Sequence, residues 1–181
     1  MAKLFIASDL HGSAHFTEIM IELFKEENAV ELILLGAVFY HGPRNPLPEG
    51  YAPMKVAELL RPYAEKLLVV KGNCDSDVDA MIAPFEFVNI AKIYVDGAKI
   101  TLQHGDKYCI DNVPENCGNA LIYGHYHTSF VTKKDGRVIA NPGSVSLPKN
   151  DTKAGYIIIE NGVVTLKALS DGQVIAKEEL A

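Results

Sequence analysis

Short apolar runs alternate with segments of helical periodicity through the first half of the chain. Apolar residues recur at three- and four-residue spacing from Phe16 to Phe24 and again from Met54 to Glu65, which predicts two amphipathic helices. Pro62 should kink or shorten the second helix, because proline cannot donate to the helical ladder. Buried strands are expected at 3–7, 31–36 and 67–70. This β-α-β-α-β order predicts a parallel sheet with right-handed crossovers.

The second half of the chain changes to short β-rich runs separated by turn dipeptides. Four dipeptides predict hairpins: Asp96-Gly97, Asp135-Gly136, Asn161-Gly162 and Asp171-Gly172. The runs around them cover 87–95, 99–103, 120–123, 130–133, 138–140, 156–160 and 163–169. We therefore expect the second half to add a mostly antiparallel sheet, within a single α/β domain that spans 1–181. A long segment with four prolines, 41–53, precedes the second helix, and loops of this length are frequently functional.

Polar residues follow nearly every strand of the predicted core. In open α/β sheets ligands bind at the carboxyl ends of the strands, so these polar side chains are expected to converge. The set is Asp9, His11, Asn73, His104, His125 and His127. The turn Asn141-Pro142-Gly143-Ser144 is expected to pack behind them.

The converging side chains are one carboxylate, one amide and four imidazoles. This donor set suits divalent ions such as Mn²⁺, Fe²⁺ or Zn²⁺. An isolated D-x-H or H-x-H pattern is common by chance, but four of the six histidines directly follow predicted strands. Two metal ions held close together can activate a water and stabilise a phosphoryl group under attack. The pattern therefore predicts a metal site.

Two further residues, outside the set of expected ligands, have more than one interpretation. Cys74 follows Asn73 and fits a small buried hydrophobe better than a nucleophile, because no dedicated base is evident in the sequence. Arg44 fits either a solvated loop charge or a clamp for a phosphate group, and we favour the clamp.

Composition narrows the class of protein further. The chain has 181 residues, of which 48% are hydrophobic, and a net charge of −6. These values exclude a disordered chain and argue against binding of nucleic-acid polymers or anionic membranes. The longest apolar run, 32–40, is too short to span a membrane. Three cysteines without C-x-x-C spacing favour a reducing compartment, so we predict a cytoplasmic protein.

The order of these motifs resembles that of the calcineurin-like metallophosphoesterases. Members of that family carry D-x-H, G-D-x-x-x-H, G-N, H-G and G-H-x-H in this order along nearly the whole chain. The segments 8–13, 41–45, 47–53, 72–75 and 141–146 resemble in particular the YfcE-type bacterial phosphodiesterases. The resemblance implies a four-layer αββα sandwich with mixed sheets and a phosphodiesterase with two divalent metals. Mn²⁺ is the first expectation for these metals, with Fe²⁺, Zn²⁺ or Ni²⁺ as alternatives.

The resemblance also assigns roles to individual residues. One metal would be held by Asp9, His11 and His127. The other would be held by Asn73, His104 and His125, which also count as catalytic. The residues that would bind the substrate are His41, Arg44 and Cys74. The implied nucleophile is a hydroxide between the metals, and no general acid is identified, because a cysteine stands where the larger family often has the acid histidine.

Ala37 departs from the family pattern. It stands in Gly36-Ala37-Val38-Phe39-Tyr40-His41, where the family has an aspartate that bridges both metals. Without that aspartate each ion has three protein ligands, and Asp9 is the one carboxylate that faces two cations. Weaker metal binding and a poorly fixed spacing are expected. A recently substituted enzyme and a natural inactive relative both fit this residue.

The leading functional hypothesis is therefore a phosphodiesterase for a small substrate, impaired by Ala37. A phosphomonoesterase is one alternative, and a non-catalytic scaffold, as in a retromer subunit of similar fold, is another. Retention of six of the seven family ligands argues against the scaffold. No membrane partner is expected, a nucleic-acid polymer is disfavoured, and association into a homo-oligomer stays open.

Overall fold

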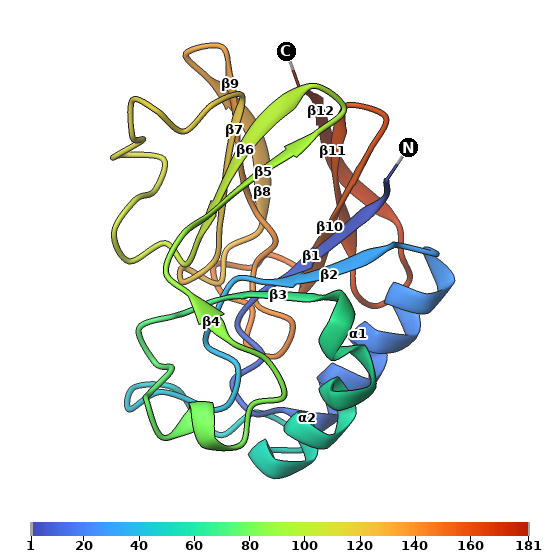
Figure 1. Cartoon of the computed structure of the whole chain (residues 1–181), viewed down its shortest axis with the longest axis vertical. Helices are drawn as coiled ribbons and strands as arrows, with labels where there is room; N and C mark the ends of the chain where they lie inside the picture. Colours follow the sequence, from blue (N-terminus) through green and yellow to red (C-terminus); the bar gives the residue numbers. More distant parts are fainter. Residues whose placement is uncertain (1, 181) are drawn as a thin grey trace.

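Two β-sheets pack face to face, and helices cover one outer side of the pair (Figure 1). The computed structural model describes residues 2–180. The first sheet has the strand order β12-β11-β10-β1-β2-β3-β4. Its strands are β1 (Leu4–Ala7), β2 (Glu31–Leu34), β3 (Leu67–Val70), β4 (Phe87–Val88), β10 (Gly155–Glu160), β11 (Val163–Ala168) and β12 (Val174–Glu179). Strands β1 to β4 are parallel, as the alternating pattern predicted for β1 to β3, and β10 to β12 are antiparallel additions.

The second sheet has the order β5-β6-β7-β9-β8. Its strands are β5 (Ala91–Val95), β6 (Ala98–Gln103), β7 (Ala120–Tyr123), β8 (Phe130–Lys134) and β9 (Arg137–Asn141). The pairs β6–β7 and β7–β9 are parallel, whereas β5–β6 and β8–β9 are antiparallel. The expectation of a separate, mostly antiparallel sheet is therefore wrong, because this sheet is mixed and β10 to β12 extend the first sheet. The apolar run 87–95 likewise splits into β4 and β5, one in each sheet.

The two helices, α1 (Ala14–Glu26) and α2 (Pro53–Leu60), pack on the first sheet. Ser13 caps α1, since its Oγ accepts the N–H of Phe16 at 3.2 Å. The predicted second helix ends early and continues as the 3₁₀ turn η1 (Arg61–Lys66), because Pro62 removes a helical donor. A further 3₁₀ turn, η2 (Asp79–Met81), precedes β4. No helix within residues 2–180 is long and apolar enough to cross a membrane.

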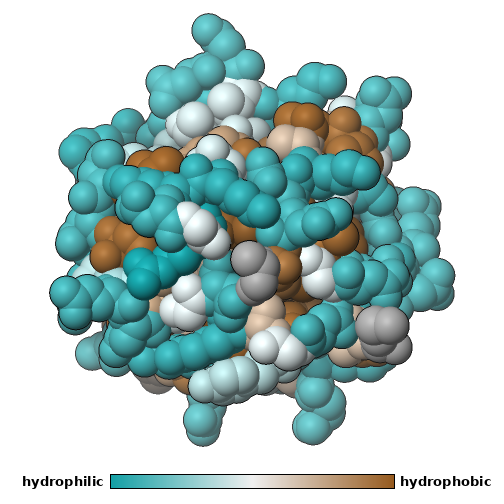
Figure 2. Space-filling model, turned by 90° about the horizontal axis from the view of Figure 1, so that it is seen from above, coloured by the Kyte–Doolittle hydropathy of each residue, from teal (hydrophilic) through white to brown (hydrophobic). Residues whose placement is uncertain are grey.

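Apolar side chains form two main layers. Successive residues of a strand point to opposite faces, so Phe5 packs toward the helices with Met20 and Phe24, whereas Ile6 packs between the sheets with Leu102. The outer face of the second sheet is covered by the segment 105–119, which forms the fourth layer of the expected sandwich. Within the described residues this segment contains no helix. The face seen in Figure 2 is largely hydrophilic, with apolar side chains in small separate groups.

Candidate metal centre

The six predicted ligands lie where strands of both sheets end. Asp9 and His11 follow β1, and Asn73 follows β3, all in the first sheet. The second sheet contributes the residues after β6 and β7, namely His104, His125 and His127. The structure brings these six side chains together in two groups of three, each containing residues from both sheets.

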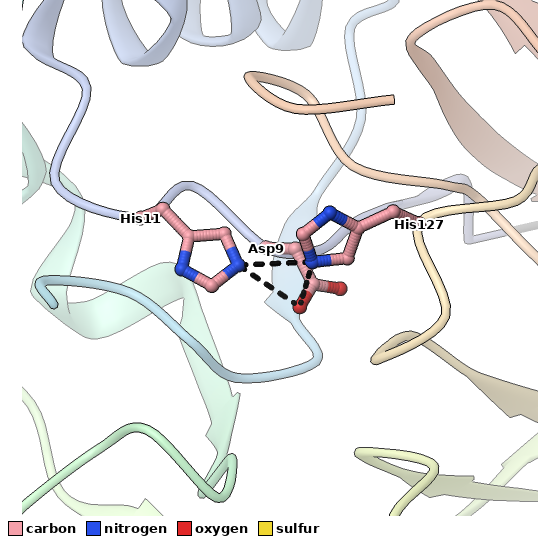
Figure 3. A group of neighbouring side chains, drawn as sticks. All are labelled: Asp9, His11 and His127. Carbon is pink, nitrogen blue, oxygen red and sulfur yellow. Dashed lines mark hydrogen bonds and ion pairs between the residues drawn. The ribbon is translucent and has the colours of Figure 1, made fainter. Parts of the chain in front are cut away.

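The first group consists of Asp9, His11 and His127 (Figure 3). The Nε2 atoms of the two histidines lie 3.0 Å apart. Asp9 Oδ1 lies 3.6 Å from Nε2 of His11 and 3.4 Å from Nε2 of His127. All three side chains are buried, with their donor atoms directed toward one another.

The second group consists of Asn73, His104 and His125. Asn73 Oδ1 lies 2.8 Å from Nε2 of His104 and 3.2 Å from Nδ1 of His125. The two imidazole nitrogens are 3.2 Å from each other. The group is more open than the first, since His125 is only half-buried.

Backbone carbonyls fix the orientation of three of these imidazoles. Nδ1 of His11 lies 2.8 Å from the carbonyl of Tyr40, and Nδ1 of His127 lies 2.7 Å from the carbonyl of Leu147. Nδ1 of His104 lies 2.6 Å from the carbonyl of Leu35. A carbonyl can only accept, so each Nδ1 donates a proton to it, and in the neutral ring each Nε2 then presents its lone pair to the group.

The first group therefore gathers electron-pair donors around one point. Two Nε2 lone pairs and a carboxylate oxygen repel one another at these distances unless a cation or a shared proton lies among them. Imidazole with carboxylate or amide oxygen is a donor set that divalent ions accept, and carbonyl-oriented histidines are the usual support of such sites. The first group fits a divalent metal ion, and the second group offers imidazole and amide donors of the same kind.

Asp9 connects the two groups. Its Oδ2 accepts hydrogen bonds from Ser8 Oγ at 2.5 Å and from the backbone N–H of His125 at 2.9 Å. Burial raises the pKa of Asp9, but interactions with His11 and His127 outweigh burial and hold that pKa well below its usual range. The carboxyl group is thus ionised at neutral pH, as a metal ligand must be.

The turn after β9 holds Asp9 from behind, as the sequence predicted. Ser144 Oγ and Ser146 Oγ donate to the backbone carbonyl of Asp9 at 2.7 and 3.2 Å. On the other side Gly124 allows close approach, because a Cβ there would stand 1.9 Å from Ser8 Oγ and 2.6 Å from Asp9 Oδ2. Glycine is therefore required beside the ligand carboxylate.

Residue 37 shares the backbone conformation of four of the six predicted ligands. Asp9, His11, His125 and His127 all have positive φ, between 48° and 66°, and Ala37 has φ of 52°. Aspartate tolerates this left-handed region better than alanine does. Ala37 is buried, and its N–H donates to Oδ2 of Asp75 at 2.8 Å.

The three residues assigned to substrate binding come from two adjoining segments. A Cβ on Gly42 would stand 3.3 Å from Sγ of Cys74, so the loop that carries His41 and Arg44 packs against Cys74. Burial raises the pKa of the Cys74 thiol, and the carboxylates of Asp75 and Asp9 raise it further, against the opposing charge of Arg44. Cys74 is thus a neutral thiol at pH 7, which agrees with its interpretation as a small packing residue rather than a nucleophile.

His41 and Arg44 differ in their surroundings. The His41 ring lies beside the rings of Tyr40 and Tyr51, with centroids 4.7 and 5.5 Å away. Among residues 2–180, its Nδ1 is the one buried side-chain nitrogen or oxygen without a hydrogen-bond partner. Arg44 is exposed.

Sequence reasoning did not single out Ser8, which hydrogen-bonds to Asp9, or Asp75, which hydrogen-bonds to the backbone of Ala37, Val38 and Gly72. Each stands within two residues of a predicted ligand, Ser8 next to Asp9 and Asp75 two positions after Asn73. Their closeness to the ligand motifs was the one signal in the sequence. A serine or an aspartate beside a ligand does not by itself indicate which groups it will hydrogen-bond.

Comparison with known proteins places this geometry in a family. Residues 2–162 match the calcineurin-like phosphoesterase superfamily domain. The chain is 42% identical to phosphodiesterase YfcE of Escherichia coli strain K12 over 179 residues, which cover 98% of this chain and 97% of that protein.

Solved structures agree with the sequence comparison. The structure of the phosphoesterase YfcE from E. coli superposes with a TM-score of 0.94 at 40% identity, covering 99% of this chain and 100% of that chain. Vacuolar protein sorting 29 from Cryptosporidium parvum shares the fold alone, with a TM-score of 0.68 at 18% identity over 99% of this chain and 98% of that chain. From the matched domain and the full-length relative, we conclude that the chain belongs to the calcineurin-like phosphoesterase superfamily.

Proposed function

We propose that this protein is a metal-dependent phosphodiesterase that acts on a small substrate through two divalent metals, Mn²⁺ in the first instance. The observation that carries the proposal is the convergence of six nitrogen and oxygen atoms able to bind a metal, in two adjoining groups at the strand ends. The 42% identity to a phosphodiesterase over nearly the whole chain supports the diester as the substrate class.

The chain's own residues would hold the metals and restrict their positions. One site would be formed by Asp9, His11 and His127, and the other by Asn73, His104 and His125. Divalent ions bound there supply Lewis-acid stabilisation of phosphoryl oxygens and lower the pKa of water. The protein contributes the pre-oriented imidazoles, because their Nδ1 hydrogen bonds to carbonyls leave no freedom to turn away.

The loop that follows β2 would bind the substrate. The exposed Arg44 guanidinium has the planar donor geometry that pairs with two phosphate oxygens. Nδ1 of His41 is buried without a partner, so it is available to a substrate atom or to a water that the substrate displaces. Cys74 would form the apolar floor between this loop and Asn73.

Ala37 would reduce the activity of this chain without removing the site. The methyl group cannot bridge two cations, so their mutual repulsion and spacing are less well controlled. We therefore propose an intact fold with a weakened centre.

The test compares an aryl phosphodiester with the corresponding aryl phosphomonoester, in Mn²⁺, for this chain and for Ala37→Asp. The proposal expects the diester to be hydrolysed faster than the monoester, with higher kcat/KM in Ala37→Asp. Preference for the monoester would favour the phosphomonoesterase. No hydrolysis in either form despite bound Mn²⁺ would favour the scaffold.

A further inference from the structure

A buried carboxylate beside the metal centre has no charged partner among residues 2–180. Asp75 is 5% exposed and forms no ion pair with a lysine, arginine or histidine in that part of the chain. Its Oδ2 accepts the N–H groups of Ala37 at 2.8 Å and of Gly72 at 2.7 Å. Its Oδ1 accepts the N–H of Val38 at 2.8 Å. Only a side chain with two acceptor oxygens can satisfy three convergent donors of this kind.

These donors belong to two different loops of the centre. Ala37 and Val38 lie on the loop after β2, and Gly72 lies on the loop after β3, directly before Asn73. The N–H of Asp75 also donates to the carbonyl of Gly72 at 3.1 Å, which closes a turn around Asn73. One side chain thus fixes the loop of residue 37 to the loop that presents a ligand.

The backbones of the two loops approach each other closely beside the ring of His104. A Cβ on Gly36 would stand 2.5 Å from the backbone nitrogen of Gly72 and 2.9 Å from Nδ1 of His104. Elsewhere on these loops Val38 is buried in the core, and the ring of Phe39 stacks on that of Phe85, with centroids 6.1 Å apart. Where Gly36 meets Gly72 no Cβ can be accommodated, and the hydrogen bonds of Asp75 join the two loops directly at this point.

We infer that Asp75 is a positioning residue. It fixes the position of residue 37 relative to Asn73 and thereby sets the spacing of the two ligand groups. The part of this inference that concerns metals rests on the proposed function. The part that concerns the two loops does not, so the two parts can be tested separately.

The test uses Asp75→Asn, which keeps the shape but replaces one acceptor oxygen with an NH₂ group facing backbone N–H donors. Tyr156→Phe is the matched control: it removes a buried hydrogen bond to Glu27, 2.9 Å long, on the helix-covered side of the first sheet. Amide hydrogen exchange is measured by NMR in metal-free protein, and Mn²⁺ affinity by calorimetry.

In Asp75→Asn, exchange at Ala37, Val38 and Gly72 is expected to rise at least tenfold (order-of-magnitude), while amides of β10 stay protected. Mn²⁺ affinity is expected to fall about 10- to 100-fold, the usual effect of losing a group that supports metal ligands. The Tyr156→Phe control should change neither quantity. Asp75→Glu keeps both oxygens and should retain more Mn²⁺ affinity than Asp75→Asn.

Unchanged exchange at the three amides would overturn the inference about the loops. Raised exchange with unchanged Mn²⁺ affinity, or a lower affinity in Asp75→Glu than in Asp75→Asn, would overturn the positioning role at the centre. Failure of both this chain and Ala37→Asp to bind Mn²⁺ would instead overturn the proposed function, and the exchange data would still decide the role of Asp75 in the loops.

Discussion

The N–H of Ala37 lies 2.8 Å from Oδ2 of Asp75, so residue 37 is anchored at the metal centre although its side chain offers no ligand. Its φ of 52° falls in the range shared by Asp9, His11, His125 and His127. An alanine held there costs roughly 1 kcal/mol relative to an ordinary conformation. The backbone at this position therefore has a conformation that aspartate adopts more readily than alanine.

Replacing Ala37 with Asp is expected to restore strong Mn²⁺-dependent hydrolysis of an aryl phosphodiester. A positioned charged group of this kind commonly contributes about 100-fold or more in rate, because it fixes the reacting groups in advance. Steady-state kinetics of both forms at saturating Mn²⁺ provide the measurement. Equal kcat in the two forms would show that the centre does not need a bridging carboxylate.

Arg44→Ala, made in the Ala37→Asp form, is expected to raise KM for a phosphodiester several-fold with little change in the thermal midpoint. The side chain is exposed, so its loss removes a phosphate contact and little packing. Arg61→Ala is the control, since Arg61 is also exposed but begins η1. A KM equal to that of the control would make Arg44 a solvated surface charge.

Mn²⁺ is expected to stabilise the folded chain, and EDTA should reverse the effect. A ligand at 100 times its dissociation constant adds about 2.7 kcal/mol, so the thermal midpoint should rise with Mn²⁺ concentration and rise further in Ala37→Asp. His11→Asn should remove most of this shift, whereas His15→Asn, on an exposed position of α1, should keep it. Equal shifts in the two variants would contradict the ligand assignment of His11.

The pH dependence of the free energy of unfolding should include a contribution from Glu27, which lies away from the metal centre. Burial raises the pKa of Glu27, but hydrogen bonds from Lys167 and Tyr156 outweigh burial and lower that pKa below its ordinary value. A carboxyl group with a lowered pKa stabilises the fold above its unfolded pKa of about 4.3 and loses this contribution as pH falls through its folded pKa.

Glu27→Gln is therefore expected to lower the free energy of unfolding at pH 7 by about 1.5 kcal/mol or more, with the difference from the parent shrinking below pH 4. Urea unfolding at pH 7, 4 and 3 measures this difference. Glu26→Gln, a neighbouring exposed position, is the control and should show little change at any pH. A difference for Glu27→Gln that persists unchanged at pH 3 would contradict the assignment.

Periodicity and turn chemistry predicted most of the elements. The runs 67–70 and 120–123 coincide with β3 and β7, and all four turn dipeptides connect paired strands. The sequence assigned no range to β12, because its residues are mostly exposed and alternate weakly. The division of 87–95 into β4 and β5 could not be predicted, because an apolar run carries no information about which sheet each part joins.

The sequence predicted that the six polar residues converge, because ligands bind at the carboxyl ends of strands in α/β sheets. That these strand ends belong to two different sheets was not predicted. Their detailed geometry did not follow. The left-handed φ of His125 and His127 turns these side chains in a way that strand alternation does not describe. The role of Asp75 was hidden as well, because its partners are backbone N–H groups, which every residue type provides.

Each ligand group takes donors from both sheets, and this has a consequence for how the molecule assembles. A fragment ending between β4 and β5 would contain Asp9, His11 and Asn73, and the remaining fragment would contain the other three donors. Neither fragment alone can complete a metal site. Coordination would therefore act as a cross-link between the two layers, so that metal uptake during folding reports the docking of one sheet on the other.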